Sequence, residues 1–107
     1  VLSQMLEVLG HEVVPAPNGK VGLDLYIDDE NGFDVVLTDQ AMPDISGIEL
    51  ALEILSINPS QPVILCTGYS DSVNPDKALS CGIRKFLFKP VTLAELSNAI
   101  IEAMKAG

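Results

Sequence analysis

The sequence predicts an α/β domain in which a parallel β-sheet is covered by helices on both faces. Short β-branched, apolar runs alternate along the chain with segments whose apolar residues recur at helical spacing. This alternation favours parallel strands joined by right-handed helical crossovers. The chain has 107 residues, of which 48% are hydrophobic, and this is enough for one core. We therefore expect one doubly wound domain.

The first half of the chain predicts helix, strand, helix and strand in that order. Residues 1–9 carry apolar side chains near helical spacing, and Gly10 predicts a left-handed cap where this helix ends. Residues 11–16 are β-branched and close on a proline, which is typical of a strand, and residues 18–32 predict a helix. The continuous apolar run at 34–39 is typical of a strand covered on both faces.

The second half continues the same alternation. Its last helix is expected to begin at Thr92, because Glu95 follows three residues later and completes a capping box. The predicted elements are a helix at 46–59, a strand at 62–67, a helix at 72–82, a strand at 85–89 and a helix at 92–107.

Three of the predicted strands end in polar residues. These are Asp39, Thr67 and Lys89, and Gly68 and Pro90 follow the last two. Taken singly, each polar residue is typical of a turn, a cap or a solvated strand end. In open parallel sheets, however, the carboxyl ends of the strands meet at one edge, where ligands bind. A carboxylate, a hydroxyl and an amine at that edge fit a nucleophile that accepts a phosphoryl group.

The composition argues against several classes of function. A net charge of −9 and a pI near 4.2 argue against direct binding to nucleic acid or to an anionic membrane, since an acidic surface repels polyanions. No apolar run has the length of a membrane span or the form of a signal peptide, so we expect a cytoplasmic domain with Cys66 and Cys81 reduced. His11 is interpreted as a surface residue. One histidine and two cysteines are a poor set of zinc ligands, since a structural zinc site needs about four.

The stretches "DVVLTDQAMPDISGIEL", "PVILCTGYS" and "GIRKFLFKPVTLAEL" closely resemble the receiver domain of two-component response regulators. The resemblance covers essentially the whole chain and implies a flavodoxin-like parallel sheet with strand order 2-1-3-4-5. It implies that Asp39 is the phosphoacceptor, which takes its phosphoryl group from a phosphohistidine on a histidine kinase or phosphotransfer domain. Thr67 is implied as the switch hydroxyl, and Lys89 as the amine that binds a phosphoryl oxygen.

The resemblance also implies roles for residues around the acceptor. Pro90 is expected in the cis form, and Phe86 is expected to be the aromatic residue that swings inward when Thr67 moves. Gly68 leaves room for the phosphoryl group. The resemblance also places Ala41 and Tyr69 at the two positions where the family tunes its rate of dephosphorylation.

Mg²⁺ is the cofactor that the resemblance implies, with Asp39 and the backbone carbonyl of Ala41 as ligands. The family's first strand ends in an acidic pair that completes this site, and the sequence begins after that pair, within the first helix. We therefore expect residues 1–107 to be an N-terminally incomplete receiver domain. A chain without that strand would expose unpaired backbone groups, and is expected to fold poorly or to pair with a neighbouring molecule.

Several local alternatives stay open at this point. Phe86 and Phe88 can be plain core residues, and Met42 with Pro43 can simply shape a turn. Asp44 and Asp71 are interpreted as turn or cap residues rather than ligands. The output surface is expected on segment 70–82 and the strand that follows it, and a dimer through the 70–89 face or through strand exchange is an alternative to a monomer.

The main functional alternative is a pseudo-receiver, an interaction module that works without phosphorylation. An aspartyl phosphatase is disfavoured because Ala41 stands where that class has a second aspartate, and a flavin site is disfavoured because Tyr69 alone is a poor partner for the ring. The segment from Leu65 to Pro90 resembles receivers attached to bacterial hybrid sensor histidine kinases. The enzymatic activity of the parent protein is therefore left open.

Overall fold

The structure is a computed structural model that describes residues 2–28, 32–40, 44–68 and 82–105. These residues form three strands, which pair in the order β1-β2-β3, and four helices. The strands are β1 (Val36–Asp39), β2 (Val63–Thr67) and β3 (Lys85–Phe88), and the helices are α1 (Leu2–Val8), α2 (Gly19–Asp28), α3 (Gly47–Ile57) and α5 (Leu93–Lys105).

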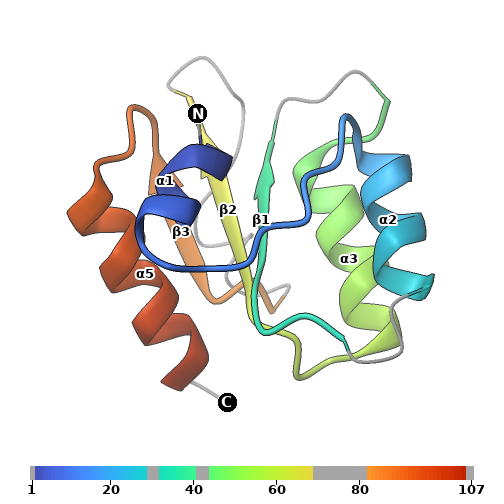
Figure 1. Ribbon diagram of the computed structural model, residues 1–107. Coiled ribbons are helices and arrows are strands. Elements are labelled where there is room, and N and C mark those ends of the chain that lie inside the picture. The colour runs from blue at the N-terminus through green and yellow to red at the C-terminus, as the bar shows by residue number, and fades with distance from the viewer. Residues whose placement is uncertain (1, 29–31, 41–43, 69–81, 106–107) are drawn as a thin grey trace.

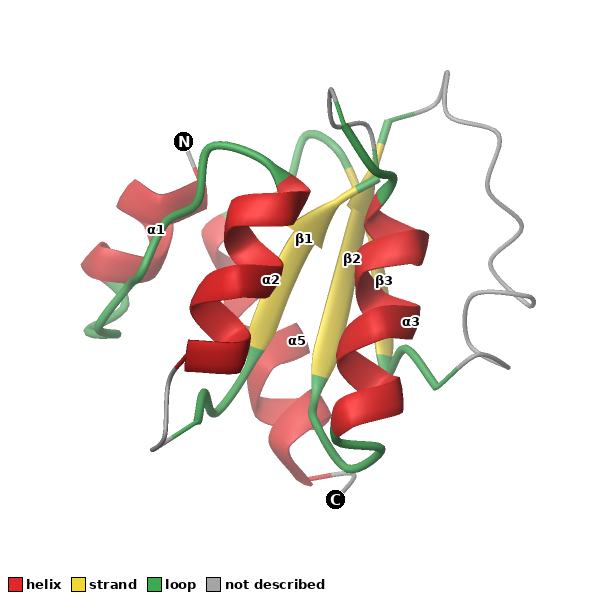
Figure 2. Cartoon of the chain, turned by 90° about the vertical axis from the view of Figure 1, so that its right-hand side faces the viewer, coloured by secondary structure: helices red, strands yellow, loops and turns green. Residues whose placement is uncertain are grey.

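The helices lie on both faces of the sheet. Helices α1 and α5 are on one side, and α2 and α3 are on the other (Figure 1). Both strand pairs are parallel, with β2 between its two neighbours. In the perpendicular view α2 and α3 lie side by side in front of the sheet, with β1 and β2 visible between them (Figure 2). The predicted α/β architecture with a parallel sheet is confirmed.

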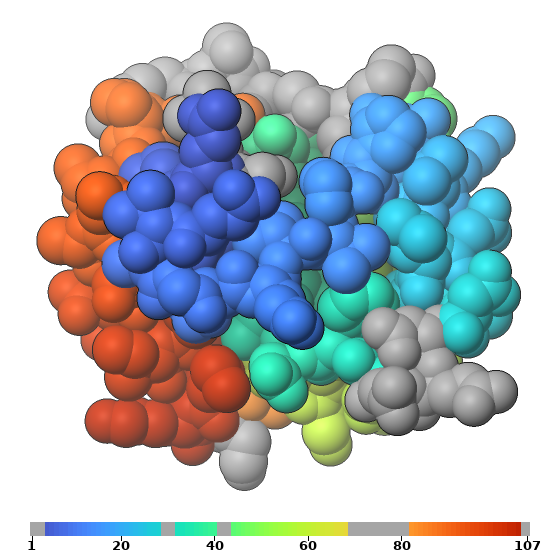
Figure 3. Space-filling model, viewed as in Figure 1, coloured from blue at the N-terminus to red at the C-terminus, as the bar shows by residue number. Residues whose placement is uncertain are grey.

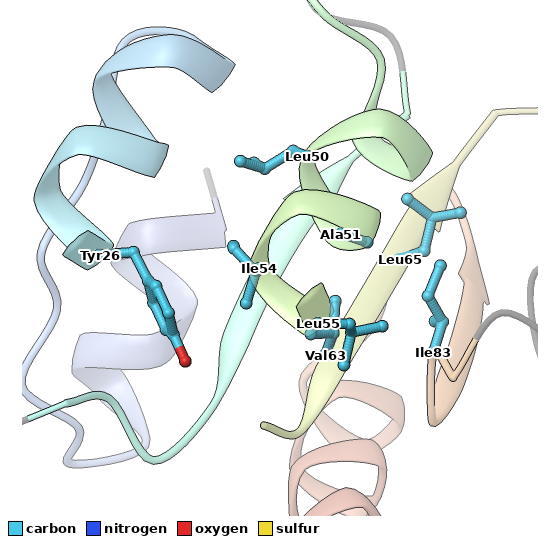
Figure 4. Packing of buried hydrophobic residues seen from close by; sticks show 8 residues of the cluster. All are labelled: Tyr26, Leu50, Ala51, Ile54, Leu55, Val63, Leu65 and Ile83. Atoms are coloured by element: carbon cyan, nitrogen blue, oxygen red, sulfur yellow. The ribbon is translucent and has the colours of Figure 1, made fainter. Parts of the chain in front are cut away.

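Strand β2 is the centre of the core, because all five of its residues are buried. Its side chains alternate between the two faces of the sheet, as the pleat requires. Val63 and Leu65 face α3, and Ile64 and Cys66 face α5. Figure 4 shows the first of these clusters, which consists of Tyr26, Leu50, Ala51, Ile54, Leu55, Val63, Leu65 and Ile83.

Polar side chains join the elements at the end of the sheet opposite the carboxyl edge. The hydroxyl of Tyr26 donates a buried hydrogen bond of 2.9 Å to Oε1 of Gln61. The guanidinium of Arg84 donates to the carbonyl of Ala103 at 2.7 Å and to the carbonyl of Ser60 at 2.8 Å. These bonds satisfy carbonyl groups at the end of α5 and in the loop before β2.

The predicted helix caps are present. Gly10 follows α1 with a φ of 91°, a left-handed conformation that glycine adopts without steric cost. At α5 the amide of Glu95 donates to Oγ1 of Thr92 at 3.1 Å, and the Thr92 amide donates to Oε1 of Glu95 at 3.4 Å. The capping box read from the sequence is therefore confirmed.

The predicted strand at 11–16 is wrong, because these residues adopt no regular structure. A strand exists only where a neighbour completes its hydrogen-bond ladder, and the described residues hold no strand beside this segment. Instead, the segment from α1 to α2 crosses in front of β1, which is an edge strand of the described sheet (Figures 1 and 3). His11 is exposed, as expected. The helix predicted at 72–82 lies almost wholly outside the described residues.

Within the described ranges, no helix combines the length and the apolar character that crossing a bilayer requires.

Candidate functional site

The three polar strand ends predicted from the sequence lie at one edge of the sheet. Asp39 ends β1 and lies opposite Cys66 of β2 in the parallel register. Thr67 is the next residue of β2, and its carbonyl accepts a hydrogen bond of 2.8 Å from the amide of Lys89, which follows β3. Adjacent parallel strands thus bring a carboxylate, a hydroxyl-bearing residue and an amine to the same edge.

Asp39 and Lys89 are in direct contact. The Nζ atom of Lys89 lies 2.9 Å from Oδ1 of Asp39, and the two side chains are 43% and 37% exposed. Oδ1 itself is buried and accepts no hydrogen bond of good geometry in the described part of the chain. The contact is therefore an ion pair whose angles are not those of a hydrogen bond, and Oδ1 can still accept a hydrogen bond or bind a cation.

Cys66 does not compete with Asp39 as an anionic nucleophile. The pKa of the Cys66 thiol is raised to about 12, chiefly by burial and also by the negative charge of Asp39, while Lys89 opposes the change. The thiol is completely buried in the α5 side of the core. Cys66 therefore stays neutral near pH 7, as expected of a reduced structural cysteine.

Thr67 is placed at the end of β2 with a buried side chain, 1% exposed. Its hydroxyl donates to the carbonyl of Gly68 at 3.3 Å. Thr67 and Leu65 have the same parity on the strand, so Thr67 faces the α3 side of the sheet. Gly68 is half-buried and follows directly.

Helix α3 begins directly against the end of β1. The amide of Gly47 donates to the carbonyl of Gln40 at 3.0 Å, and the amide of Ile48 donates to the Gln40 side-chain Oε1 at 3.0 Å. A Cβ atom on Gly47 would lie 2.3 Å from the carbonyl oxygen of Asp39, so this close approach requires glycine. Reasoning from the sequence missed Gln40, because a glutamine after a strand carries no signal of which helix it contacts.

Asp44 caps a helix, as predicted, but the helix is α2 rather than the one that follows it. Its Oδ1 accepts from the Gly19 amide at 3.1 Å and its Oδ2 accepts from the Lys20 amide at 2.8 Å. The hydrogen bond from Lys20 is the largest cause that lowers the pKa of Asp44 below its usual 3.8, with further backbone bonds from Ile45 and Gly19. The carboxylate thereby joins the loop after β1 to the beginning of α2.

The aromatic residues of β3 differ in burial. Phe86 is half-buried and packs on the α3 side of the core, whereas Phe88 is 45% exposed. The interpretation of Phe88 as a plain core residue is therefore wrong, since almost half of its surface is exposed. The two rings meet edge to face with centroids 5.1 Å apart. The Lys89–Pro90 peptide bond is cis, as the resemblance implies.

The described residues supply one carboxylate for a metal ion at this edge. Asp39 fits a hard cation because its buried Oδ1 accepts no hydrogen bond from these described residues. No group of three or more His, Cys, Asp or Glu side chains within the described ranges is arranged to hold a metal. The remaining residues discussed above, Ala41, Met42, Pro43, Tyr69, Asp71 and Cys81, lie outside the described residues.

An acid and a lysine paired at the carboxyl edge of a parallel, helix-covered sheet define a doubly wound α/β protein with its site at the strand ends. The chain belongs to the response regulator receiver domain family, whose pattern matches residues 1–101. In structure it is similar to a receiver domain protein from Clostridium thermocellum, with a TM-score of 0.91 and 38% identity over 98% of this chain and 83% of that one.

Two curated relatives have different overall functions. The transcriptional regulatory protein ZraR of Klebsiella oxytoca is 36% identical over 97% of this chain, and a cyclic di-GMP phosphodiesterase of Thermotoga maritima is 36% identical over the same share. The chain spans 23% and 27% of these relatives. The similarity therefore identifies the class of domain, and a hybrid histidine kinase as the parent protein stays a prediction.

Proposed function

We propose that this domain is a phosphorelay receiver that takes a phosphoryl group from a partner phosphohistidine onto Asp39. The observation that carries the proposal is the Oδ1 atom of Asp39, which is buried, accepts no hydrogen bond from the residues that the structure describes, and lies 2.9 Å from the Lys89 ammonium. This arrangement places a nucleophilic oxygen and a cation side by side, so that the cation can bind the phosphoryl oxygens.

The transfer exchanges one bond to phosphorus for another. An oxygen of the Asp39 carboxylate attacks the phosphorus, and the P–N bond of the phosphohistidine breaks. The electron pair of that bond returns to the imidazole nitrogen, and the phosphoryl group is left on Asp39 as an acyl phosphate. With acetyl phosphate as donor, a P–O bond breaks instead and acetate leaves.

The residues around Asp39 compensate the negative charge that the phosphoryl group brings. Lys89 redistributes its contact from the Asp39 carboxylate to a phosphoryl oxygen, and the Thr67 hydroxyl turns from the Gly68 carbonyl to another. Gly68 leaves room beside the acceptor because it has no side chain. Ala41 and Tyr69 are assigned the role of setting how readily water reaches the acyl phosphate.

Mg²⁺ is the proposed cofactor, with the Asp39 carboxylate and the Ala41 backbone carbonyl among its ligands. When bound, it would neutralise charge on the transferring phosphoryl group. The acidic ligands that complete the family's site are not among the described residues. Asp39 would hold the ion through a carboxylate oxygen, and the Lys89 ammonium would supply a second positive charge for the phosphoryl group.

The output is proposed to pass through Phe86, which packs on the α3 side of the core and contacts Phe88. If the Thr67 hydroxyl turns toward the phosphoryl group, the half-buried Phe86 ring can fill the space that it leaves. The surface that includes β3 would then change its shape for a partner. The proposed partner is a histidine kinase or a phosphotransfer domain. A dimer through the face that includes β3 and a cytoplasmic location are also proposed.

Intact-mass analysis tests the acceptor. The intact natural protein is incubated with acetyl phosphate and Mg²⁺, beside an Asp39→Asn variant. We expect the wild type to gain the mass of one phosphoryl group and the variant to gain none. A gain that persists in Asp39→Asn would exclude Asp39 as the acceptor. No gain in the wild type, from acetyl phosphate or from a phosphohistidine protein, would favour the pseudo-receiver alternative.

A further inference from the structure

Gln40, the residue directly after the acceptor, is held at three points. Its amide donates to the carbonyl of Cys66 at 2.9 Å, which continues the ladder between β1 and β2. Its carbonyl accepts from the amide of Gly47 at 3.0 Å, and its side-chain Oε1 accepts from the amide of Ile48 at 3.0 Å. One residue thereby fastens the first turn of α3 to the end of the acceptor strand.

The first backbone amides of α3 donate to two different residues, Gln40 and Ser46. The first amides of a helix have no partners within it and need outside acceptors. Gln40 satisfies two of them, whereas the third, of Glu49, donates to Oγ of Ser46 at 3.2 Å. Ser46 is the ordinary N-cap and directly precedes α3. Gln40 directly follows β1 and bonds to β2, so its hydrogen bonds connect α3 to the sheet.

The support acts next to the reacting carboxylate. The Asp39 carbonyl lies against Gly47, at the close approach noted above. Displacing the first turn of α3 would therefore move the backbone of Asp39. Its side chain would then move relative to the Lys89 ammonium on the other side of β2.

We propose that Gln40 is a positioning residue for phosphoryl transfer, which sets the place of the Asp39 carboxylate by fastening α3 to β1. The inference rests on the proposed function. A neutral amide suits this task, since a carboxylate at the same place would add a like charge beside the incoming phosphoryl group. Small displacements matter because the attacking oxygen must be aligned with phosphorus, and an error of about 1 Å can slow a reaction roughly a hundredfold.

The test compares two variants that each remove one acceptor from the beginning of α3. Gln40→Met removes Oε1 at similar size, and Ser46→Ala removes the N-cap oxygen as a matched control. We expect Gln40→Met to lower the maximal rate of phosphorylation by acetyl phosphate at least about tenfold, with little change in the half-saturating donor concentration. Ser46→Ala is expected to stay within about twofold of wild type, although both variants lose a helix cap.

A second readout does not depend on phosphorylation. The side-chain carboxyl ¹³C resonance of Asp39 is identified by its loss in Asp39→Asn and then recorded in each variant. We expect it to shift or broaden in Gln40→Met and to remain as in wild type in Ser46→Ala. In Gln40→Glu, which keeps an oxygen acceptor but adds a negative charge, the wild-type line width is expected to recover even where the position of the resonance does not. Rescue by Gln40→Glu would separate a lost hydrogen bond from a general loss of packing.

The outcomes separate the inference from the function on which it rests. If the wild type is phosphorylated and Gln40→Met reacts as fast as Ser46→Ala, Gln40 is a helix cap and the inference is overturned. If the wild type accepts no phosphoryl group, the proposed function fails and the carboxyl resonance decides alone. An unchanged Asp39 resonance in Gln40→Met would then overturn the positioning role.

Discussion

The ammonium of Lys89 lies 2.9 Å from a buried carboxylate oxygen of Asp39, although Asp39 ends β1 and Lys89 follows β3, with β2 between these strands. The pair joins the outer strands of the described sheet at their carboxyl ends. Both side chains are more than one third exposed, so water and salt screen the attraction and the pair adds little to stability. Its importance lies in the placement of opposite charges where a phosphoryl group would arrive.

Replacing Lys89 with methionine is expected to slow phosphorylation of Asp39 by about 10²–10³-fold, because a preorganised cation is lost from the transferring oxygens. Lys85→Met is the control, since Lys85 lies in β3, the strand that Lys89 follows, but pairs with Glu102 of α5. The rate of mass gain with acetyl phosphate measures both variants. Equal rates in the two variants would show that Lys89 acts only through the net charge of the domain.

Gly47→Ala is expected to destabilise the fold by about 1–3 kcal/mol, because overpacking a close contact strains the backbone. The new Cβ would lie 2.3 Å from the Asp39 carbonyl oxygen and 2.7 Å from Cδ1 of Leu65. Urea unfolding, followed by circular dichroism, measures the change in the free energy of unfolding.

Gly22→Ala is the matched control for this substitution. A Cβ on Gly22 would meet Ala16 at 3.5 Å, an ordinary contact, within helix α2. Alanine is the better helix former, so a gain of up to about 1 kcal/mol is expected. If Gly47→Ala were as stable as wild type, α3 would not be packed against the acceptor strand as closely as the structure has it.

Asp44→Asn is expected to lower stability at pH 7 and to lose this effect in acid. Hydrogen bonds from Lys20 and other backbone amides hold the pKa of Asp44 below 3.8 in the folded protein. A depressed folded pKa contributes stability that is complete above the unfolded value and disappears as the pH falls through the folded value. The difference in urea midpoint between wild type and variant should therefore shrink below about pH 4.

Asp24→Asn supplies the control for this pH series, because Asp24 is an exposed acid on the same helix, α2. Its removal reports the effect of one fewer negative charge on an acidic chain. An Asp44→Asn difference that stayed constant from pH 7 to pH 3, or that Asp24→Asn reproduced, would contradict a specific cap on α2.

Much of the fold could be predicted from local patterns. The period of apolar residues distinguishes helices from strands, and Gly10 and the Thr92–Glu95 pair end or begin helices through bonds within a few residues. The convergence of Asp39 and Lys89 also follows from the sequence, because the carboxyl ends of parallel strands share an edge.

The sequence by itself thus determined the α/β alternation, the caps that close within one turn, and which residue types stand at the strand ends. The tertiary structure alone decided that residues 11–16 form no strand, because a ladder needs a neighbour. It also decided that Asp44 caps α2 and that Gln40 holds α3. For Asp44 and Gln40 the reason is that a polar side chain bonds to whichever backbone group the packed elements bring within about 3 Å, and the sequence does not encode that distance locally.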